Sequence, residues 1–396
     1  MEITQAKKAV IAAGERLVES GLIARTWGNV SCRVSDNSFV ITPSGKPYIG
    51  LTPDDIVEVK IDDLYWEGDV KPSSEKGIHA EVYKIHPNAN FVIHTHQKNA
   101  SAISALKSGL DTVSNKLIGS KVFLGGYGLP GTGKLKKGVA NALRLSSSKA
   151  VIMAHHGAVC FGKDSDEAFE VALALEKECE SYILCGASEK LGTTCNDFED
   201  FCKKIAKNLT KNKKTIAISK SLVYNSYCDR DRGEIILENR ETGAKAKMNL
   251  TTGETDTPVD ESAKAHRDIY LVNPGFKDII HNCDTETVAV SALGKTMRPL
   301  LDDFSQLCGT RVKTAKSVDQ CGKKVKGKNA VLLEDRGALC CGKNSGDAQA
   351  VDMIMSKSCL TLLTSKVFPA ARPINPVEAL LMRVIYLKKY SKQAED

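Results

Sequence analysis

Residues 88–106 read NANFVIHTHQKNASAISAL, an apolar run that ends in two histidines one residue apart. The same frame returns in residues 276–293, FKDIIHNCDTETVAVSAL, with cysteine in place of the second histidine. Because alternate residues of a strand face the same way, the first stretch directs two imidazoles to one side of a sheet. It therefore predicts a strand that presents two metal ligands, and the repeat predicts the same strand with one of them lost.

The duplication extends beyond this stretch. Seven residues recur as the same type 187 positions later: His79, Tyr83, Pro87, His94, Ser104, Ala105 and Leu106. Further on, GAVCFGK at 157–163 matches GALCCGK at 337–343, 180 positions later. A chain of 396 residues also exceeds one ordinary core and fits two domains of about 200 residues. We therefore expect two copies of one unit, at residues 1–205 and 216–396, with a lysine-rich linker at 203–215.

Composition narrows the class of protein. The chain is 42% hydrophobic and 26% charged, and its apolar runs are shorter than the roughly 18 residues that span a bilayer, so we expect a soluble protein without a membrane partner. Residues 1–17 lack the apolar core of a signal peptide, which predicts a cytoplasmic protein with reduced cysteines. The net charge of +7 comes without an arginine-rich stripe with interleaved aromatics, so nucleic acid is not an expected partner.

Two histidines need a third ligand before they make a metal site. The strand predicted at AVIMAHH, residues 150–156, ends in His155 and His156. Three histidines with an open fourth position are the ligand set of a catalytic zinc site. We therefore predict that His94, His96 and His156 hold a divalent metal ion.

The second copy provides an internal control for this prediction. His96 becomes Cys283 and His156 becomes Arg336, while Gly157 recurs as Gly337. Histidines that served packing would not be lost together from a copy that keeps its glycines. We expect a metal ion in the first copy and none in the second, where the arginine would repel a cation. Zinc (Zn2+) is the expected ion, although three imidazoles also suit manganese, cobalt or iron.

Five motifs in this order resemble the class II aldolase/adducin family: TWGNVS (26–31), ITPSGKPY (41–48), KPSSEKGIH (71–79), VIHTH (92–96) and HHG (155–157). The resemblance implies an α/β fold with three α/β/α layers and a largely antiparallel central sheet. It also implies a ring-shaped homo-oligomer with active sites between neighbouring units. Two tandem chains would then form a dimer that mimics a four-unit ring.

A phosphate site is predicted from the same motifs. SSE at 73–75 opens a predicted helix, where free N–H groups and the helix dipole favour an anion. Two glycines in turns allow close backbone approach, and neighbouring polar side chains add donors. In the family these positions surround a sugar phosphate, and here they are Gly28, Asn29, Ser44, Gly45, Ser73 and Ser74.

Glu75 follows the two serines and matches the position of the family's acid/base carboxylate. Aldolases of the family resemble SSE at this motif, whereas the ribulose-phosphate epimerase resembles SSD. The repeat places Ser262 opposite Glu75, so the second copy has lost the carboxylate together with the metal ligands.

These residues lead us to expect a reversible, metal-dependent aldol cleavage of a ketose 1-phosphate to dihydroxyacetone phosphate and an aldehyde, with Glu75 as acid and base. Two alternatives stay open. One is a dehydratase or epimerase of the same family, and the other is a non-catalytic, adducin-like scaffold. The family's second proton donor is a tyrosine, but Asn115 occupies the comparable position here, and Tyr127 is the candidate that replaces it.

Overall fold

The protein is described by a computed structural model that covers residues 1–23, 27–210 and 223–390. Thr26 of the TWGNVS motif and residues 211–215 of the expected linker lie outside these ranges. Residues 203–209, the other part of that linker, belong to helix α6 (Phe198–Leu209). The linker prediction was wrong there, because α6 buries Phe201 and Ile205 on one face and keeps its lysines on the other side.

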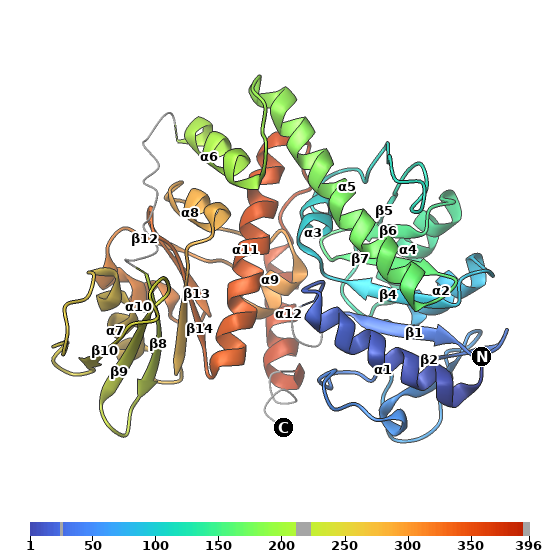
Figure 1. Ribbon diagram of the computed structural model, residues 1–396, viewed down its shortest axis with the longest axis horizontal. Coiled ribbons are helices and arrows are strands. Elements are labelled where there is room, and N and C mark those ends of the chain that lie inside the picture. Colours follow the sequence, from blue (N-terminus) through green and yellow to red (C-terminus); the bar gives the residue numbers. More distant parts are fainter. Residues whose placement is uncertain (24–26, 211–222, 391–396) are drawn as a thin grey trace. The chain divides into compact units, whose positions relative to one another are not determined.

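The chain forms two compact units. Among the described residues, the first takes 1–183 with two C-terminal segments, 368–372 and 384–390, and the second takes 184–367 and 373–383. In both, the strands follow one another along the chain in the same arrangement, as the colours of Figure 1 allow the reader to follow. The division at 1–205 and 216–396 stays a prediction.

The first unit is built on a sheet of seven described strands in the order β3-β2-β1-β4-β7-β6-β5. Every neighbouring pair is antiparallel except β5 with β6. The strands are β1 (Asn29–Arg33), β2 (Ser38–Ile41), β3 (Val57–Lys60), β4 (Phe91–Thr95), β5 (Leu124–Gly125), β6 (Ala150–Met153) and β7 (Ala158–Gly162).

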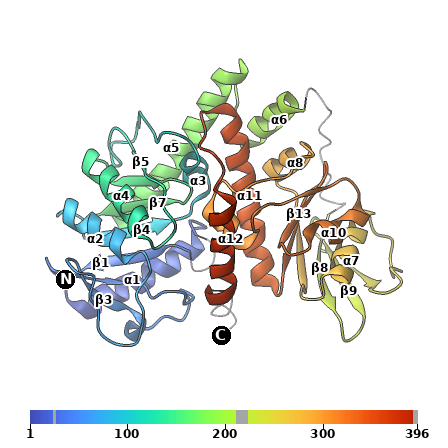
Figure 2. The same cartoon turned by 180° about the vertical axis from the view of Figure 1, so that it is seen from behind.

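Helices cover both faces of this sheet. Those of the first unit are α1 (Ile3–Glu19), the 3-10 turn η1 (Pro53–Asp55), α2 (Lys76–Ile85), α3 (Lys98–Ser104), α4 (Gly133–Leu145) and the start of α5 (Ser165–Leu191), followed near the C-terminus by the π-helix η4 (Tyr386–Tyr390). Helices α2 and α4 pack on one face, while α1 and α5 lie over the other, as the opposing views of Figures 1 and 2 show.

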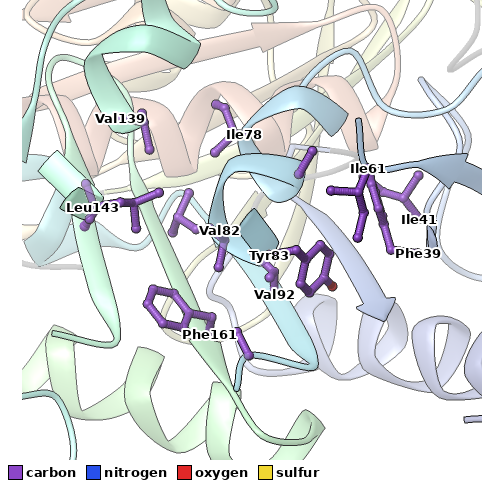
Figure 3. Close-up of a cluster of buried hydrophobic side chains, with 14 of the residues drawn as sticks. Phe39, Ile41, Ile61, Ile78, Val82, Tyr83, Val92, Val139, Leu143 and Phe161 are labelled. Atoms are coloured by element: carbon purple, nitrogen blue, oxygen red, sulfur yellow. The ribbon is translucent and has the colours of Figure 1, made fainter. Parts of the chain in front are cut away.

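The core under α2 and α4 follows from the alternation of the strands and the helical spacing of apolar residues. Ile78 and Val82 of α2 meet Val92 of β4 and Phe161 of β7 in this core, and Val139 of α4 completes it (Figure 3). Because Val92 points to this face, His94 and His96, two and four residues later, are directed toward the same side. The packing of α2 thus decides what lies opposite the histidines.

The second unit repeats the architecture with the strand order β10-β9-β8-β11-β14-β13-β12 among its described residues. Its strands are β8 (Tyr224–Asp229), β9 (Glu234–Asn239), β10 (Lys245–Asn249), β11 (Asp278–Asn282), β12 (Thr314–Ala315), β13 (Ala330–Leu333) and β14 (Gly337–Gly342). Its helices, besides α6, are α7 (Ser262–Val272), α8 (Thr285–Ser291), α9 (Asp302–Leu307), η3 (Val318–Gln320), α10 (Cys321–Val325), α11 (Ser345–Val367) and α12 (Pro376–Ile385). The expected duplicated α/β/α fold with largely antiparallel sheets is confirmed.

No helix in the described ranges combines the length and the apolar composition that crossing a membrane requires.

Candidate active site

Three histidines meet at one end of the first sheet. His94 lies on β4, His96 follows directly after it, and His156 lies in the turn from β6 to β7. The Nε2 atom of His94 is 2.9 Å from Nε2 of His96 and 3.1 Å from Nε2 of His156. The structure therefore brings together the three predicted ligands, all of them buried, within 4.8 Å of one another.

The donor set suits a divalent cation. A tetrahedral zinc ion with Zn–N bonds of about 2.0–2.1 Å places its ligand nitrogens about 3.3 Å apart, close to the spacing seen here. The Nδ1 atom of His94 lies 2.9 Å from the carbonyl oxygen of Ala158 and donates to it, which leaves the Nε2 lone pair facing the cluster. Burial lowers the pKa of His94 well below its ordinary value, and the charge of Glu75 opposes this shift.

The turn between β6 and β7 decides which histidine of the pair joins the cluster. His155 has a φ of 61°, a left-handed conformation that only a few residue types adopt readily, and its ring packs edge-on to Tyr127 with centroids 5.2 Å apart. The next residue, His156, then faces the site. A Cβ at Gly157 would lie 2.2 Å from the carbonyl oxygen of Thr95, so glycine alone fits after the pair.

Glu75 lies against this cluster. Its carboxylate oxygens are 3.2 Å from Nε2 of His94 and 3.1 Å from Nε2 of His156, and the side chain is buried. Burial opposes ionisation, but the charges of His94 and then His156 outweigh it and hold the pKa of the Glu75 carboxyl well below its usual range. A buried, ionised carboxylate beside three imidazoles is placed to take up or return a proton next to a bound metal ion.

The predicted phosphate residues fall into two groups. The loops that carry Ser44, Gly45, Ser73 and Ser74 run side by side, joined by a bridge between Pro43 and Pro72. In that pairing, the N–H of Ser44 donates to the carbonyl oxygen of Lys71 at 2.9 Å, and the N–H of Ser73 donates to that of Thr42 at 3.0 Å.

Gly28 and Asn29 lie at the start of β1 instead, next to His94. Gly28 has a φ of 113°, and a Cβ there would lie 2.7 Å from the carbonyl oxygen of His94. The amide of Asn29 donates through Nδ2 to Oε2 of Glu75 at 3.1 Å. This side chain therefore contacts the carboxylate directly.

The helix that SSE was predicted to open starts directly after this motif. The helix begins at Lys76, and Glu75 is its N-cap residue without a side-chain capping hydrogen bond. Ser73 instead accepts the backbone N–H of Glu75 on its Oγ at 3.2 Å. A tight turn thus precedes the helix and points the Glu75 side chain inward, while Ser74 stays exposed.

A set of buried residues behind Glu75 was not predicted as part of the site. Ser31 forms hydrogen bonds with both His79 and Tyr83, and His79 also contacts Asn29. The signal that finds them is the spacing of Glu75, His79 and Tyr83, four residues apart, together with the recurrence of His79 and Tyr83 in the second copy.

The equivalent place in the second unit has different chemistry. His281 Nε2 lies 2.6 Å from the carbonyl oxygen of Arg336 and donates to it, so it faces the backbone. The guanidinium of Arg336 pairs with Asp260 at 2.9 Å. Burial lowers the pKa of His281 to about 4, which leaves this ring neutral. An arginine and an ion pair thus occupy the position that a histidine takes in the first unit.

The duplicated three-layer unit, with its largely antiparallel sheet, is of the class II aldolase type. The sequence matches the class II aldolase and adducin N-terminal domain over residues 8–183 and again over residues 214–363. The protein therefore belongs to this family, as two tandem copies of its domain.

Relatives of known activity are sugar-phosphate aldolases. The 5-methylthioribulose-1-phosphate/5-deoxyribulose-1-phosphate aldolase of Rhodospirillum rubrum is 30% identical over 182 residues, 45% of this chain and 80% of that protein. L-fuculose phosphate aldolase of Escherichia coli is 31% identical over 186 residues, 46% of this chain and 85% of that protein. The structure of an L-fuculose 1-phosphate aldolase superposes with a TM-score of 0.44 and 28% identity, over 50% of this chain and 93% of that one.

Proposed function

We propose that the first unit is a metal-dependent aldolase that reversibly cleaves a ketose 1-phosphate to dihydroxyacetone phosphate and an aldehyde. The observation that carries the proposal is the Glu75 carboxylate, buried within 3.2 Å of two histidines of a three-histidine cluster. The family membership and the aldolase relatives support the same reaction class. Zinc is the ion we propose, held by His94, His96 and His156.

When bound, the ion would act as a Lewis acid that draws electron density from the substrate's ketone. Glu75 supplies the proton chemistry: in the direction of synthesis it removes a proton from the carbon acid of dihydroxyacetone phosphate, and in cleavage it returns that proton. Gly45 and the hydroxyl groups of Ser44, Ser73 and Ser74 would hold the phosphate, which keeps the reacting carbon in register with Glu75. The second proton donor stays a prediction, with Tyr127 as its candidate.

For the second unit we propose a non-catalytic role in assembly. The loss of Glu75, His96 and His156, replaced by Ser262, Cys283 and Arg336, supports this, as does the ion pair between Arg336 and Asp260. A homo-oligomer of tandem chains in which such units complete a ring also stays a prediction.

The test combines metal analysis with activity assays that measure the release of dihydroxyacetone phosphate. The substrates assayed are L-fuculose 1-phosphate, 5-deoxyribulose 1-phosphate and 5-methylthioribulose 1-phosphate. We expect about one zinc per chain and turnover of at least one substrate. Glu75→Gln should lower kcat by about 10²- to 10⁴-fold while the metal is kept. Glu81→Gln makes the same change one turn and a half along α2, where the carboxylate pairs with Arg144, and serves as the control.

A Glu75→Gln variant with full activity would remove the acid/base assignment. Loss of water from the substrate without release of dihydroxyacetone phosphate would favour the dehydratase. A wild-type protein with neither stoichiometric metal nor turnover would favour the scaffold.

A further inference from the structure

Five side chains form one buried row between β1 and α2. On the helix side, Glu75, His79 and Tyr83 are spaced four residues apart and share one face. On the strand side, Asn29 and Ser31 alternate toward the same face as Val92 and His94, their partners on β4. The two sets of side chains therefore interleave, and all five are buried.

The row is a continuous series of hydrogen bonds. The hydroxyl of Tyr83 lies 2.7 Å from Ser31 Oγ, which lies 2.6 Å from Nδ1 of His79. Nε2 of His79 lies 2.5 Å from Oδ1 of Asn29, and Nδ2 of Asn29 donates to Oε2 of Glu75 at 3.1 Å. The series thus ends on the proposed acid/base carboxylate.

The chemistry of the groups sets one direction for every bond. Because an ionised carboxylate only accepts, Asn29 must present its NH₂ group to Glu75 and its carbonyl oxygen to His79. His79 must then carry its proton on Nε2, which leaves Nδ1 to accept from Ser31, and Ser31 accepts from Tyr83. Burial, partly opposed by the charge of Glu75, lowers the pKa of His79 to about 3, so the ring is neutral and holds one proton.

The second unit keeps the inner part of this row. Ser226 Oγ lies 2.7 Å from Nδ1 of His266 and 2.9 Å from the hydroxyl of Tyr270, as in the first unit. Since these three residues persist where the metal ligands are lost, their shared contribution is the packing of the helix on the strand.

In the second unit the row of hydrogen bonds ends at the position equivalent to Asn29. Tyr224 occupies that strand position, and Ser262 stands in place of Glu75. Among the described residues, Nε2 of His266 has no hydrogen-bond partner. The link from histidine through asparagine to a carboxylate is thus particular to the unit that has the three-histidine cluster.

We propose that Asn29 is a positioning residue that holds the Glu75 carboxylate at the histidine cluster, with its amide orientation set by the proton on His79 Nε2. The inference deepens the proposed aldolase function and rests on it. It also gives the Asn29 side chain a role other than the predicted binding of phosphate, because its amide contacts both Glu75 and His79.

Steady-state kinetics separate the two roles. If Asn29 positions Glu75, Asn29→Ala lowers kcat by about 10- to 100-fold, the effect of a small misplacement of a catalytic group, and leaves KM and metal content unchanged. Binding of phosphate by the side chain predicts the opposite, a raised KM with kcat retained, and that result would overturn the proposal.

Variants of His79 test the orientation of the amide. His79→Gln keeps an N–H donor toward Oδ1 of Asn29, whereas His79→Leu removes it, so the glutamine variant should retain more of the wild-type kcat. His266→Leu removes the matching side chain, with its Ser226 and Tyr270 contacts, from the second unit and is the control that should leave kcat unchanged. Equal kcat for His79→Leu and the wild type contradicts the proposal.

A readout independent of turnover is the tautomer of His79, measured by ¹⁵N NMR of the imidazoles in the full-length protein. The proposal requires the proton on Nε2, and it requires that the signal of this proton change in Asn29→Ala. A proton on Nδ1 would reverse the donor and the acceptor in every hydrogen bond of the row, and it would refute the proposal. If the wild-type protein cleaves no ketose phosphate, the proposed aldolase function is refuted instead. The tautomer of His79 then tests the hydrogen-bond series by itself.

Discussion

A buried histidine stabilises a fold only while it stays neutral. His79 and His266 lie at equivalent positions, fully buried, and burial lowers the pKa of each to about 3, whereas a histidine in an unfolded chain titrates near 6.5. Between these two values the unfolded chain binds a proton that the folded chain does not. Acid therefore favours unfolding in this window, and each histidine contributes to the effect.

His266 belongs to the second unit, which lacks the metal ligands, so it isolates this effect. As the pH falls from about 6.5 toward about 3, the wild type should lose stability by up to about 1.4 kcal/mol per pH unit through this group alone. His266→Leu removes the group, so the free energy of unfolding of the variant should decline less on acidification. Urea unfolding at about pH 7 and about pH 5 measures the difference, and parallel pH dependences of the two proteins would refute the assignment.

At the scale of elements, the turn from β6 to β7 and its counterpart from β13 to β14 share one backbone geometry. His155 and Asp335 both have a φ of 61°, and both turns continue into a glycine whose Cβ would meet a carbonyl oxygen of the neighbouring strand at 2.2 Å or less. The geometry is kept although the side chains differ. Backbone sterics therefore account for the retained glycines, independently of any metal.

Gly157→Ala should destabilise the protein by about 1–3 kcal/mol, because the new methyl group and the carbonyl of Thr95 cannot both keep their places. Gly133→Ala is the matched control: it lies at the start of α4, a Cβ there meets nothing within 4 Å, and alanine should be neutral or slightly stabilising. Thermal unfolding of the metal-free proteins compares them. Equal unfolding temperatures for the two variants would contradict the steric account.

At the scale of the whole molecule, the duplication lets one unit serve as the control for the other. If the ion binds only at His94, His96 and His156, its removal should loosen the first unit alone, since a ligand stabilises the folded state to which it binds. We expect a chelator to speed amide hydrogen exchange in residues 92–96 and 153–158. The corresponding residues 279–283 and 333–338 should exchange as before, and a change of equal size in both units would contradict a single metal site.

The sequence by itself determined the features that depend on spacing within one element. The alternation in VIHTH put two histidines on one side of a strand, and the repeat identified which residues had been lost from the second copy. These local patterns did not by themselves predict a largely antiparallel α/β/α unit, and that expectation came from the family resemblance. The prediction of a linker at residues 203–209 was wrong because it rested on the lysines, which lie on the exposed side of α6, and overlooked the apolar residues of its buried face.

Only the tertiary structure decided which side chains lie opposite one another across neighbouring elements. Asn29 and Glu75 are 46 residues apart, and their contact depends on the register of β1 against β4 and on the packing of α2 across both. The same packing turned Glu75 toward His94 and moved the start of the helix to Lys76. A side chain's partner across a sheet is set by how whole elements pack, which the spacing of residues along any one of them does not contain.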